Sequence, residues 1–151
     1  GDFDICLLAS SRKDMNFRNG IHVWLDFQYP ENSSLLILLS FIISGHPDWR
    51  KSKITLFATC KSGKDEETKS KLSELVMTGR LPITEKNIEI IPEEPGKTIK
   101  NLINEKSAPA ALVMTGFNPQ ALKHMGDSLL TGYDGVGTIL FVNSRNQKEI
   151  V

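Results

Sequence analysis

The sequence has little cysteine, no excess of either charge and no hydrophobic run of membrane-spanning length. Its two cysteines, Cys6 and Cys60, are too few for a disulfide framework and lie in apolar segments, so we expect two buried thiols in a reduced compartment. Its 18 basic and 18 acidic residues cancel, which argues against nucleic acid or anionic lipid as a partner. The longest apolar run, residues 35–43, is far shorter than the ~20 residues of a bilayer span, so we expect no membrane crossing within the chain.

The chain also begins without an initial Met, a basic n-region or the apolar segment of a signal peptide. We therefore expect a fragment of a longer polypeptide, or a chain that keeps the remnant of a tag. Its length is that of one domain, and it contains no repeat, linker or low-complexity segment. We predict a single domain over residues 1–151, in which residues 1–19 add an N-terminal strand and a turn.

Strand-like and helix-like patterns alternate along the chain. Strands are expected at residues 4–9, 21–27, 54–59, 87–91, 110–115 and 138–142, and helices at residues 32–45, 65–78, 95–105 and 119–130. From residue 21 onward each strand is joined to the next by a helix, and such crossovers build parallel sheets. We therefore predict an α/β fold: an open sheet of five to six strands, parallel but mixed at one edge, with helices on both faces as a three-layer sandwich.

The expected helix around residues 35–43 is apolar on nearly every side. A helix of this kind is buried on more than one side. Its inner side would cover the sheet. Its outer side requires a second cover, for which the extra N-terminal strand, a missing domain and a partner subunit are the alternatives.

No stretch of the sequence carries a complete catalytic or metal-binding motif. Residues 58–65 resemble a P-loop, but Ala58 replaces its first glycine and Asp65 replaces the Ser or Thr that would hold magnesium. Glycines 132, 135 and 137 follow a helix and precede a strand, which is typical of a helix C-cap and turn, not of a dinucleotide fingerprint. The three histidines lack a second ligand at suitable spacing. We predict no catalytic residue, no metal site and no cofactor.

The segment Trp49-Arg50-Lys51 places an aromatic residue beside two cations, a pattern that nucleic acid or lipid headgroups can attract. The patch is short and the rest of the chain is neutral. We therefore interpret Trp49 as an anchor against the sheet at the end of a helix, with the two cations in solvent or at an interface.

One position in the predicted sheet favours a ligand. Open parallel sheets bind ligands beyond the carboxyl ends of their strands, where the strand order reverses. If the common doubly wound order applies, this crevice lies between the strands at residues 21–27 and 110–115. The candidate residues for a small anion or nucleotide are Asp26, Gln28, Asn32, Ser33, Gly116, Phe117 and Asn118. Asn32 and Ser33 fit equally well as helix N-caps.

Several segments resemble the cytoplasmic C-terminal domain of the cation–chloride cotransporters, and they follow one another in the same order. They are Ile21-His22-Val23-Trp24, Leu35-Leu36-Ile37-Leu38-Leu39, Trp49-Arg50-Lys51-Ser52-Lys53-Ile54-Thr55-Leu56-Phe57, Ser107-Ala108-Pro109-Ala110-Ala111-Leu112-Val113-Met114 with Gly116-Phe117-Asn118-Pro119, and the last strand at residues 136–143. The resemblance covers residues 20–151 and is to prokaryotic members or distant relatives of the family.

The resemblance implies a fold related to the universal stress proteins and a domain without catalytic activity. It implies a regulatory or dimerisation role on the cytoplasmic side of the membrane, within a transporter for Na⁺, K⁺ and Cl⁻. The implied partners are the transmembrane portion of the same transporter and a second copy of the domain, and no nucleic acid is implied.

The sequence departs from these relatives at three places. Leu25 stands where a second Trp is frequent. Residues 28–33 replace an Asp-Gly-Gly loop that is common in the family, so contacts made by that loop do not carry over. ATP-binding universal stress proteins carry a second glycine where Pro119 stands and a third where Leu129 stands, which argues against tight ATP binding. A stand-alone nucleotide-binding sensor of the universal-stress-protein type is the alternative function.

Overall fold

The computed structural model describes residues 4–10, 16–26, 30–78 and 83–144. Its strands are β1 (Ile5–Ser10), β2 (Ile21–Asp26), β3 (Ile54–Cys60), β4 (Ile88–Pro92), β5 (Leu112–Gly116) and β6 (Thr138–Asn143). Its α-helices are α1 (Pro30–Ser44), α2 (Asp65–Thr78), α3 (Ile99–Lys106) and α4 (Pro119–Met125). Short 3-10 helices are η1 (Phe17–Asn19), η2 (Pro47–Trp49), η3 (Glu85–Asn87) and η4 (Gly126–Leu129).

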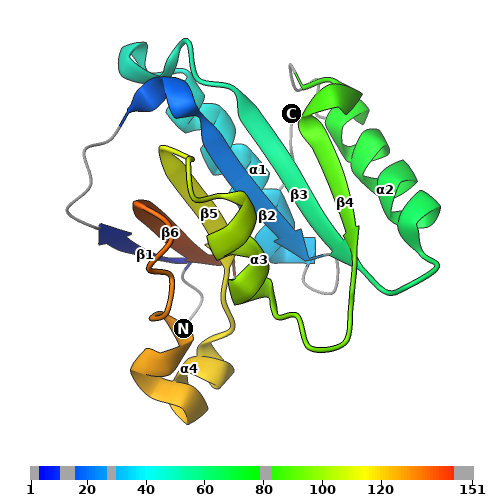
Figure 1. Ribbon diagram of the computed structural model, residues 1–151. Helices are drawn as coiled ribbons and strands as arrows, with labels where there is room; N and C mark the ends of the chain where they lie inside the picture. Colours follow the sequence, from blue (N-terminus) through cyan, green and yellow to red (C-terminus); the bar gives the residue numbers. More distant parts are fainter. Residues whose placement is uncertain (1–3, 11–15, 27–29, 79–82, 145–151) are drawn as a thin grey trace.

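The sheet winds outward in both directions from β2, which lies in its interior (Figure 1). The strand order is β1-β6-β5-β2-β3-β4, and β2 pairs in parallel with both β3 and β5. β4 and β6 continue the parallel arrangement on either side, whereas β1 pairs antiparallel with β6 at one edge. The predicted fold, an open sheet that is parallel except at one edge, is confirmed.

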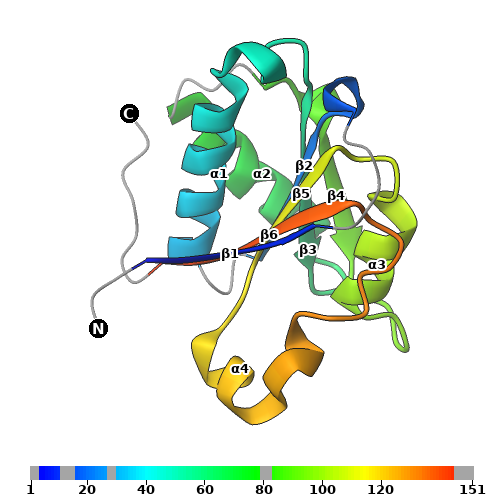
Figure 2. The same ribbon diagram turned by 90° about the vertical axis from the view of Figure 1, so that its left-hand side faces the viewer.

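The helices cover both faces of this sheet, as Figure 2 shows with the sheet turned nearly edge-on. α1 and α2 lie on one face and α3 on the other, while α4 lies beyond the carboxyl ends of the strands. Two cores follow from this arrangement, one on each face. Because side chains alternate along a strand, β2 sends Val23 and Leu25 into the first core and Trp24 into the second.

The N-terminus of β2 depends on Gly20. This residue has φ +87° and ψ 178°, a conformation that is essentially restricted to glycine. An added Cβ would stand 2.6 Å from the carbonyl oxygen of Lys53, which accepts a hydrogen bond from the Ile21 amide. The Gly20 carbonyl accepts in turn from the amide of Ala111. The segments that lead into β2, β3 and β5 are therefore joined at this residue.

Two helix ends differ by more than two residues from the predicted bounds, for local reasons. The helix predicted from residue 95 begins at Ile99, because Thr98 and Asn101 form a capping box there. The helix predicted over residues 119–130 ends at Met125, since Gly126 has φ +59° and the chain continues as η4. The bounds of α2 are those predicted.

The expectation of two buried thiols is right for Cys60 and wrong for Cys6. Cys6 is exposed because β1 is an edge strand, whose residues are exposed apart from the half-buried Leu7. Desolvation, followed by the nearby Asp4 carboxylate, raises the pKa of the Cys6 thiol.

The outer side of α1 is covered only in part. The N-terminal half of α1 contains buried residues such as Leu35. In its C-terminal half, Ile42 is 62% exposed and Phe41 is also exposed. β1 lies at the sheet edge and pairs with β6, so it does not provide the cover expected for this side. The other two alternatives for that cover, a missing domain and a partner subunit, stay predictions.

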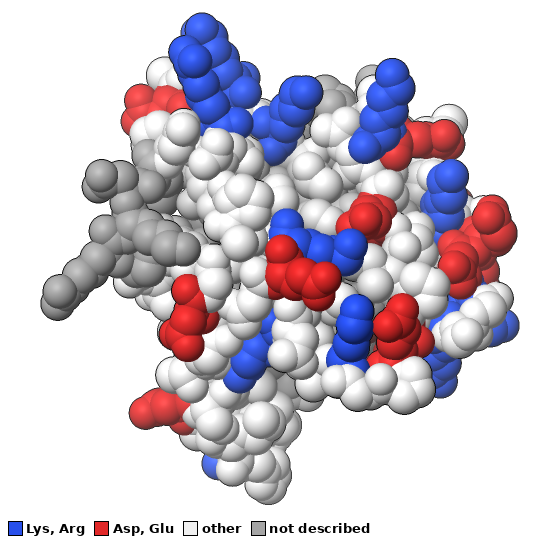
Figure 3. All heavy atoms as spheres, in the orientation of Figure 1, with Lys and Arg blue, Asp and Glu red and all other residues white. Residues whose placement is uncertain are grey.

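Trp49 is half-buried against the core beside α1, as expected for an anchor. Its ring packs edge to face on Phe17, with 4.7 Å between the ring centroids. Arg50 and Lys51 are exposed and border a shallow hollow with Asp48. Acidic and basic side chains are interspersed over the face shown in Figure 3, which agrees with the balanced composition.

Candidate functional site

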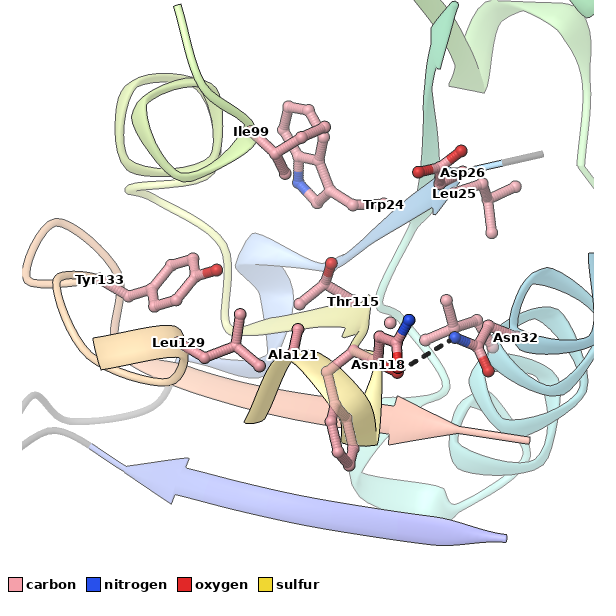
Figure 4. A pocket seen from close by; sticks show the side chains of 13 residues that line it. Trp24, Leu25, Asp26, Asn32, Ile99, Thr115, Asn118, Ala121, Leu129 and Tyr133 are labelled. Carbon is pink, nitrogen blue, oxygen red and sulfur yellow. Dashed lines mark hydrogen bonds between the residues drawn. The ribbon is translucent and has the colours of Figure 1, made fainter. Parts of the chain in front are cut away.

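A cavity of about 240 Å³ lies at the carboxyl ends of β2 and β5, the two strands between which the strand order reverses. Its walls come from these strands, the N-termini of α1 and α3, and the segment from α4 through Tyr133 (Figure 4). The sequence predicted a crevice between these two strands, and the cavity is found there.

The candidate residues separate into three groups. Asp26, Asn32, Gly116, Phe117 and Asn118 line the cavity. Ser33 does not line it, and its hydroxyl instead donates to the Asp26 carbonyl oxygen at 3.2 Å. Gln28 lies outside the described residues.

Asn32 fills the side of the crevice next to α1. Its Nδ2 donates to the Phe117 carbonyl oxygen at 3.3 Å, and its Oδ1 accepts from the Ser144 amide at 2.7 Å. The Asn143 side chain also donates to the Phe117 carbonyl, at 3.1 Å. A Cβ at Gly116 would come within 3.1 Å of Asn32 Nδ2, so glycine leaves room for this side chain. Asn32 therefore connects α1 by hydrogen bonds to the residues that follow β5 and β6. It is not the helix N-cap that the sequence suggested, because α1 begins at Pro30.

Asn118 is likewise occupied by the protein. Its side-chain oxygen accepts a hydrogen bond from the Gln120 amide at 2.8 Å and so caps α4. The pair of asparagines predicted for a ligand thus mainly stabilises the loops around the cavity.

Most of the lining is apolar and was not identified from the sequence. It comprises Trp24, Leu25, Leu36, Ile99, Ala121, Leu129 and Tyr133, together with Thr115. Alternation along β2 places Trp24 and Leu25 on opposite faces, but both line the cavity at the strand end, so alternation alone does not identify the lining. Ile99 and Tyr133 could not be found in this way, since they belong to distant segments that only the tertiary fold brings together.

Two hydroxyl groups point into the cavity, as Figure 4 shows for Thr115 and Tyr133. Thr115 is only 6% exposed, and neither hydroxyl has a hydrogen-bond partner within the described part of the chain. The Tyr133 ring packs on Phe141, and burial raises the pKa of its hydroxyl, which keeps the group protonated.

The segment that closes the cavity is fastened to α3. Lys100 Nζ donates to the Ser128 carbonyl oxygen at 2.8 Å and lies 5.2 Å from the centroid of the Tyr133 ring. The Asn104 side chain donates to the Gly132 carbonyl at 2.8 Å and accepts from the Gly135 amide at 2.9 Å. Gly135 lies in a turn beside α3, as the sequence predicted. The helix C-cap predicted for these glycines is wrong, because α4 ends at Met125 and its C-cap is Gly126.

A second polar cluster lies behind Trp24. The Ser107 hydroxyl accepts from Trp24 Nε1 at 2.9 Å and is 2.8 Å from His22 Nδ1. Desolvation lowers the pKa of His22, while Glu89 acts in the opposite direction. A serine next to a histidine is the start of a nucleophilic site, but Ser107 is 0% exposed, so no substrate reaches its hydroxyl. We interpret this cluster as structural.

Within the described ranges, no three His, Cys, Asp or Glu side chains are grouped for metal binding. Over the same ranges, none of the helices has both the length and the apolar character that a bilayer span demands. At the P-loop-like segment, Asp65 is the first residue of α2, where a carboxylate stabilises the helix N-terminus.

These features define a doubly wound α/β domain with an apolar cavity at its switch point. The chain is similar to a protein described as the cytoplasmic domain of a prokaryotic cation chloride cotransporter, known from a crystal structure. The TM-score is 0.68 at 14% sequence identity, and the match covers 96% of this chain and 54% of that one. This chain therefore spans about half the length of that protein. The likeness confirms the fold that the sequence resemblance implied. No known family profile and no curated protein matches the chain.

Proposed function

We propose that the chain is a non-catalytic regulatory and dimerisation domain on the cytoplasmic side of a cation–chloride cotransporter. The transporter would move Na⁺, K⁺ and Cl⁻, and the domain would contact its transmembrane portion and a second copy of itself. The observation that carries the proposal is the likeness in fold over 96% of the chain to a cytoplasmic domain of such a transporter. The segments of the sequence that resemble this family lie in β2, α1, β3, β5 and β6, which form the sheet and part of its cover.

Exposed apolar side chains support a role in assembly. Leu8 on β1 is 66% exposed and Ile42 on α1 is 62% exposed, and both lie on elements that border the sheet or cover it. β1 also presents an outer edge for which the described residues provide no pairing strand. Apolar edge strands and apolar helix faces are usually covered by another chain. In this proposal a second copy covers the β1 edge.

The first test is to read the gene upstream of the codon for Gly1. The proposal expects several segments of about 20 apolar residues each, which would encode the membrane-spanning helices. A start codon immediately upstream, with no such segments anywhere in the gene, contradicts the transporter role.

The dimerisation role is tested by sedimentation velocity of the chain over a hundredfold range of concentration. The wild type is expected to form dimers at the higher concentrations, and Leu8→Glu to shift the equilibrium toward monomer. Met77→Glu is the matched control, because Met77 is an exposed apolar residue on α2, away from the β1 edge. A wild type that stays monomeric throughout, or equal weakening by both variants, contradicts the proposed interface.

A nucleotide-binding sensor remains the alternative, and the cavity at the switch point is the observation in its favour. Two features count against it. Asn32 fills the side of the crevice next to the helix that follows β2, and the described residues that line the cavity include no Lys or Arg. Calorimetric titration with ATP distinguishes the two functions, since a nucleotide sensor requires saturable binding.

A further inference from the structure

The cavity at the switch point has the size of a small ring system. An engineered protein cavity of about 150 Å³ is enough for benzene. At about 240 Å³, this cavity has room for a molecule of two fused rings. Trp24 and Tyr133 add flat ring surfaces to a lining that also includes aliphatic side chains such as Leu129.

The polar side chains of the lining are Asp26, two asparagines that bind the protein, and two hydroxyl groups. Thr115 Oγ1 projects from the floor formed by β5, and the Tyr133 hydroxyl projects from the opposite wall, toward the same space (Figure 4). Neither hydroxyl has a hydrogen-bond partner among the described residues. Among the described residues no buried side-chain oxygen lacks a hydrogen-bond partner, so both hydroxyls are accessible to solvent through the open cavity. A ligand that fills the cavity would remove this access, so it must donate or accept a hydrogen bond to keep both hydroxyls satisfied.

The charge of the lining restricts the ligand further. Asp26 is the only charged side chain among the described residues around the cavity, and it is acidic. Lys100 lies next to Tyr133, but its ammonium group donates to the Ser128 carbonyl, and Lys100 is not one of the residues that line the cavity. A phosphate or carboxylate would therefore find no cation within the lining to offset its desolvation.

We propose that this cavity is a binding site for a small, uncharged aromatic molecule with one hydrogen-bonding group, about the size of indole. The rings would lie between Trp24 and Leu129, and the polar group would bond with the hydroxyls of Thr115 and Tyr133. This binding concerns the domain itself and does not depend on the transporter role. Its outcome is therefore separate from that of the proposed function.

The test is a titration of the isotope-labelled chain with four probes, followed by two-dimensional amide NMR. The probes are indole, phenol, benzene and ATP. Indole and phenol are expected to cause saturable shifts that centre on the amides of Thr115, Gly116 and Tyr133. Absence of saturable indole and phenol binding, or shifts scattered over the whole surface, overturns the proposal. Saturable binding of ATP without binding of indole also overturns it and favours an anion site.

Variants separate the hydroxyls from the cavity walls. Thr115→Val and Tyr133→Phe each keep the shape and remove one hydroxyl, so each is expected to weaken indole binding about two- to tenfold. Benzene has no hydrogen-bonding group, and its affinity is expected to stay within about twofold of the wild-type value. Equal effects on indole and benzene contradict the assigned role of the hydroxyls.

Ala121→Leu tests the location by filling the cavity from α4. This variant is expected to lose binding of indole and benzene together, while Met77→Leu, a matched change on α2, keeps both. If Ala121→Leu binds indole like the wild type, the site lies elsewhere and the proposal fails. If Ala121→Leu does not fold, the Thr115→Val and Tyr133→Phe variants still test the proposal.

Discussion

The two faces of the sheet are built from different side chains. The core under α1 and α2 is mainly aliphatic, and its fully buried members include Ile21, Val23, Leu56 and Leu72. The core on the α3 face is aromatic, with Phe141 as one of its most buried residues and Trp24 stacked on Phe57 at 4.5 Å between ring centroids. Both cores draw on the same strands, because successive residues of a strand point to opposite faces.

Because of this difference, we assign the two faces different roles: the aliphatic face mainly stabilises the fold, and the aromatic face provides the polar and binding groups. Branched aliphatic side chains interdigitate closely, and the face under α1 and α2 is closed by two long helices. The α3 face has one short helix and the segment after α4 as its cover, and it contains the two hydroxyls, the Ser107 cluster and part of the cavity lining, to which Leu25 and Leu36 of the other face also contribute. We therefore expect substitutions on the first face to lower stability most, and those on the second face to change binding and pH response.

The largest expected effect comes from a residue on which both faces depend. Gly20→Ala forces a side chain into a backbone conformation reserved for glycine and against the Lys53 carbonyl, which lies 2.6 Å from the new Cβ. We expect a loss of at least about 4 kcal/mol in the free energy of unfolding, measured by urea denaturation.

Gly63→Ala is the control for that prediction. Gly63 has a similar φ of +85°, but a Cβ there meets nothing within 4 Å. The control should therefore lose only the conformational part, about 1 kcal/mol. Equal losses in the two variants would mean that contact with the Lys53 carbonyl is not the main cause.

The next prediction compares the two faces directly through one chemical change. Leu56→Ala removes a fully buried side chain from the aliphatic core and should cost about 3 kcal/mol, since a closed cavity remains. Leu129→Ala removes the same atoms from the wall of an existing cavity and should cost about 1 kcal/mol or less. Similar losses in urea denaturation would show that the two faces are packed equally tightly.

A smaller effect is expected at the polar cluster of the aromatic face. Ser107→Ala leaves the buried Trp24 Nε1 without its acceptor, which should cost about 2 kcal/mol. A double-mutant cycle with Trp24→Phe checks the cause, because Phe has no N–H that needs an acceptor. In the Trp24→Phe background the Ser107→Ala change should cost less. Strictly additive losses would contradict the importance of this hydrogen bond.

Much of the fold could be predicted from the sequence because its signals are local. The apolar runs at β5 and β6 and the strand–helix alternation from Ile21 onward predict a parallel sheet without knowledge of distant contacts. The predictions are wrong where the burial of a residue depends on which segments lie next to it in the fold. Cys6 lies in an apolar run, yet it is exposed because β1 is at the edge of the sheet.

The site could be predicted in position but not in character. The switch point follows from the strand order, so Asp26, Gly116 and Asn118 were placed correctly beside a cavity. The expectation of an anion or nucleotide came from the polar residues near the strand ends. The structure shows that Asn32 and Asn118 bind the backbone instead, and that Ile99 and Tyr133 from distant segments make the lining apolar.

The smallest expected effect is a pH dependence of stability below neutral pH that comes from the aromatic face. Burial lowers the pKa of His22 in the folded chain, so His22 stays neutral there and can accept from the Ser107 hydroxyl. Above the unfolded value of about 6.5, both states are neutral and His22 costs nothing. As the pH falls below that value, the unfolded chain takes up the proton first, and stability declines until the pH passes the folded pKa. We expect the urea midpoint to fall between pH 8 and pH 5.5, and to fall less in His22→Gln, which does not titrate. A parallel decline in both chains would mean that other groups cause the pH dependence and that His22 has no part in it.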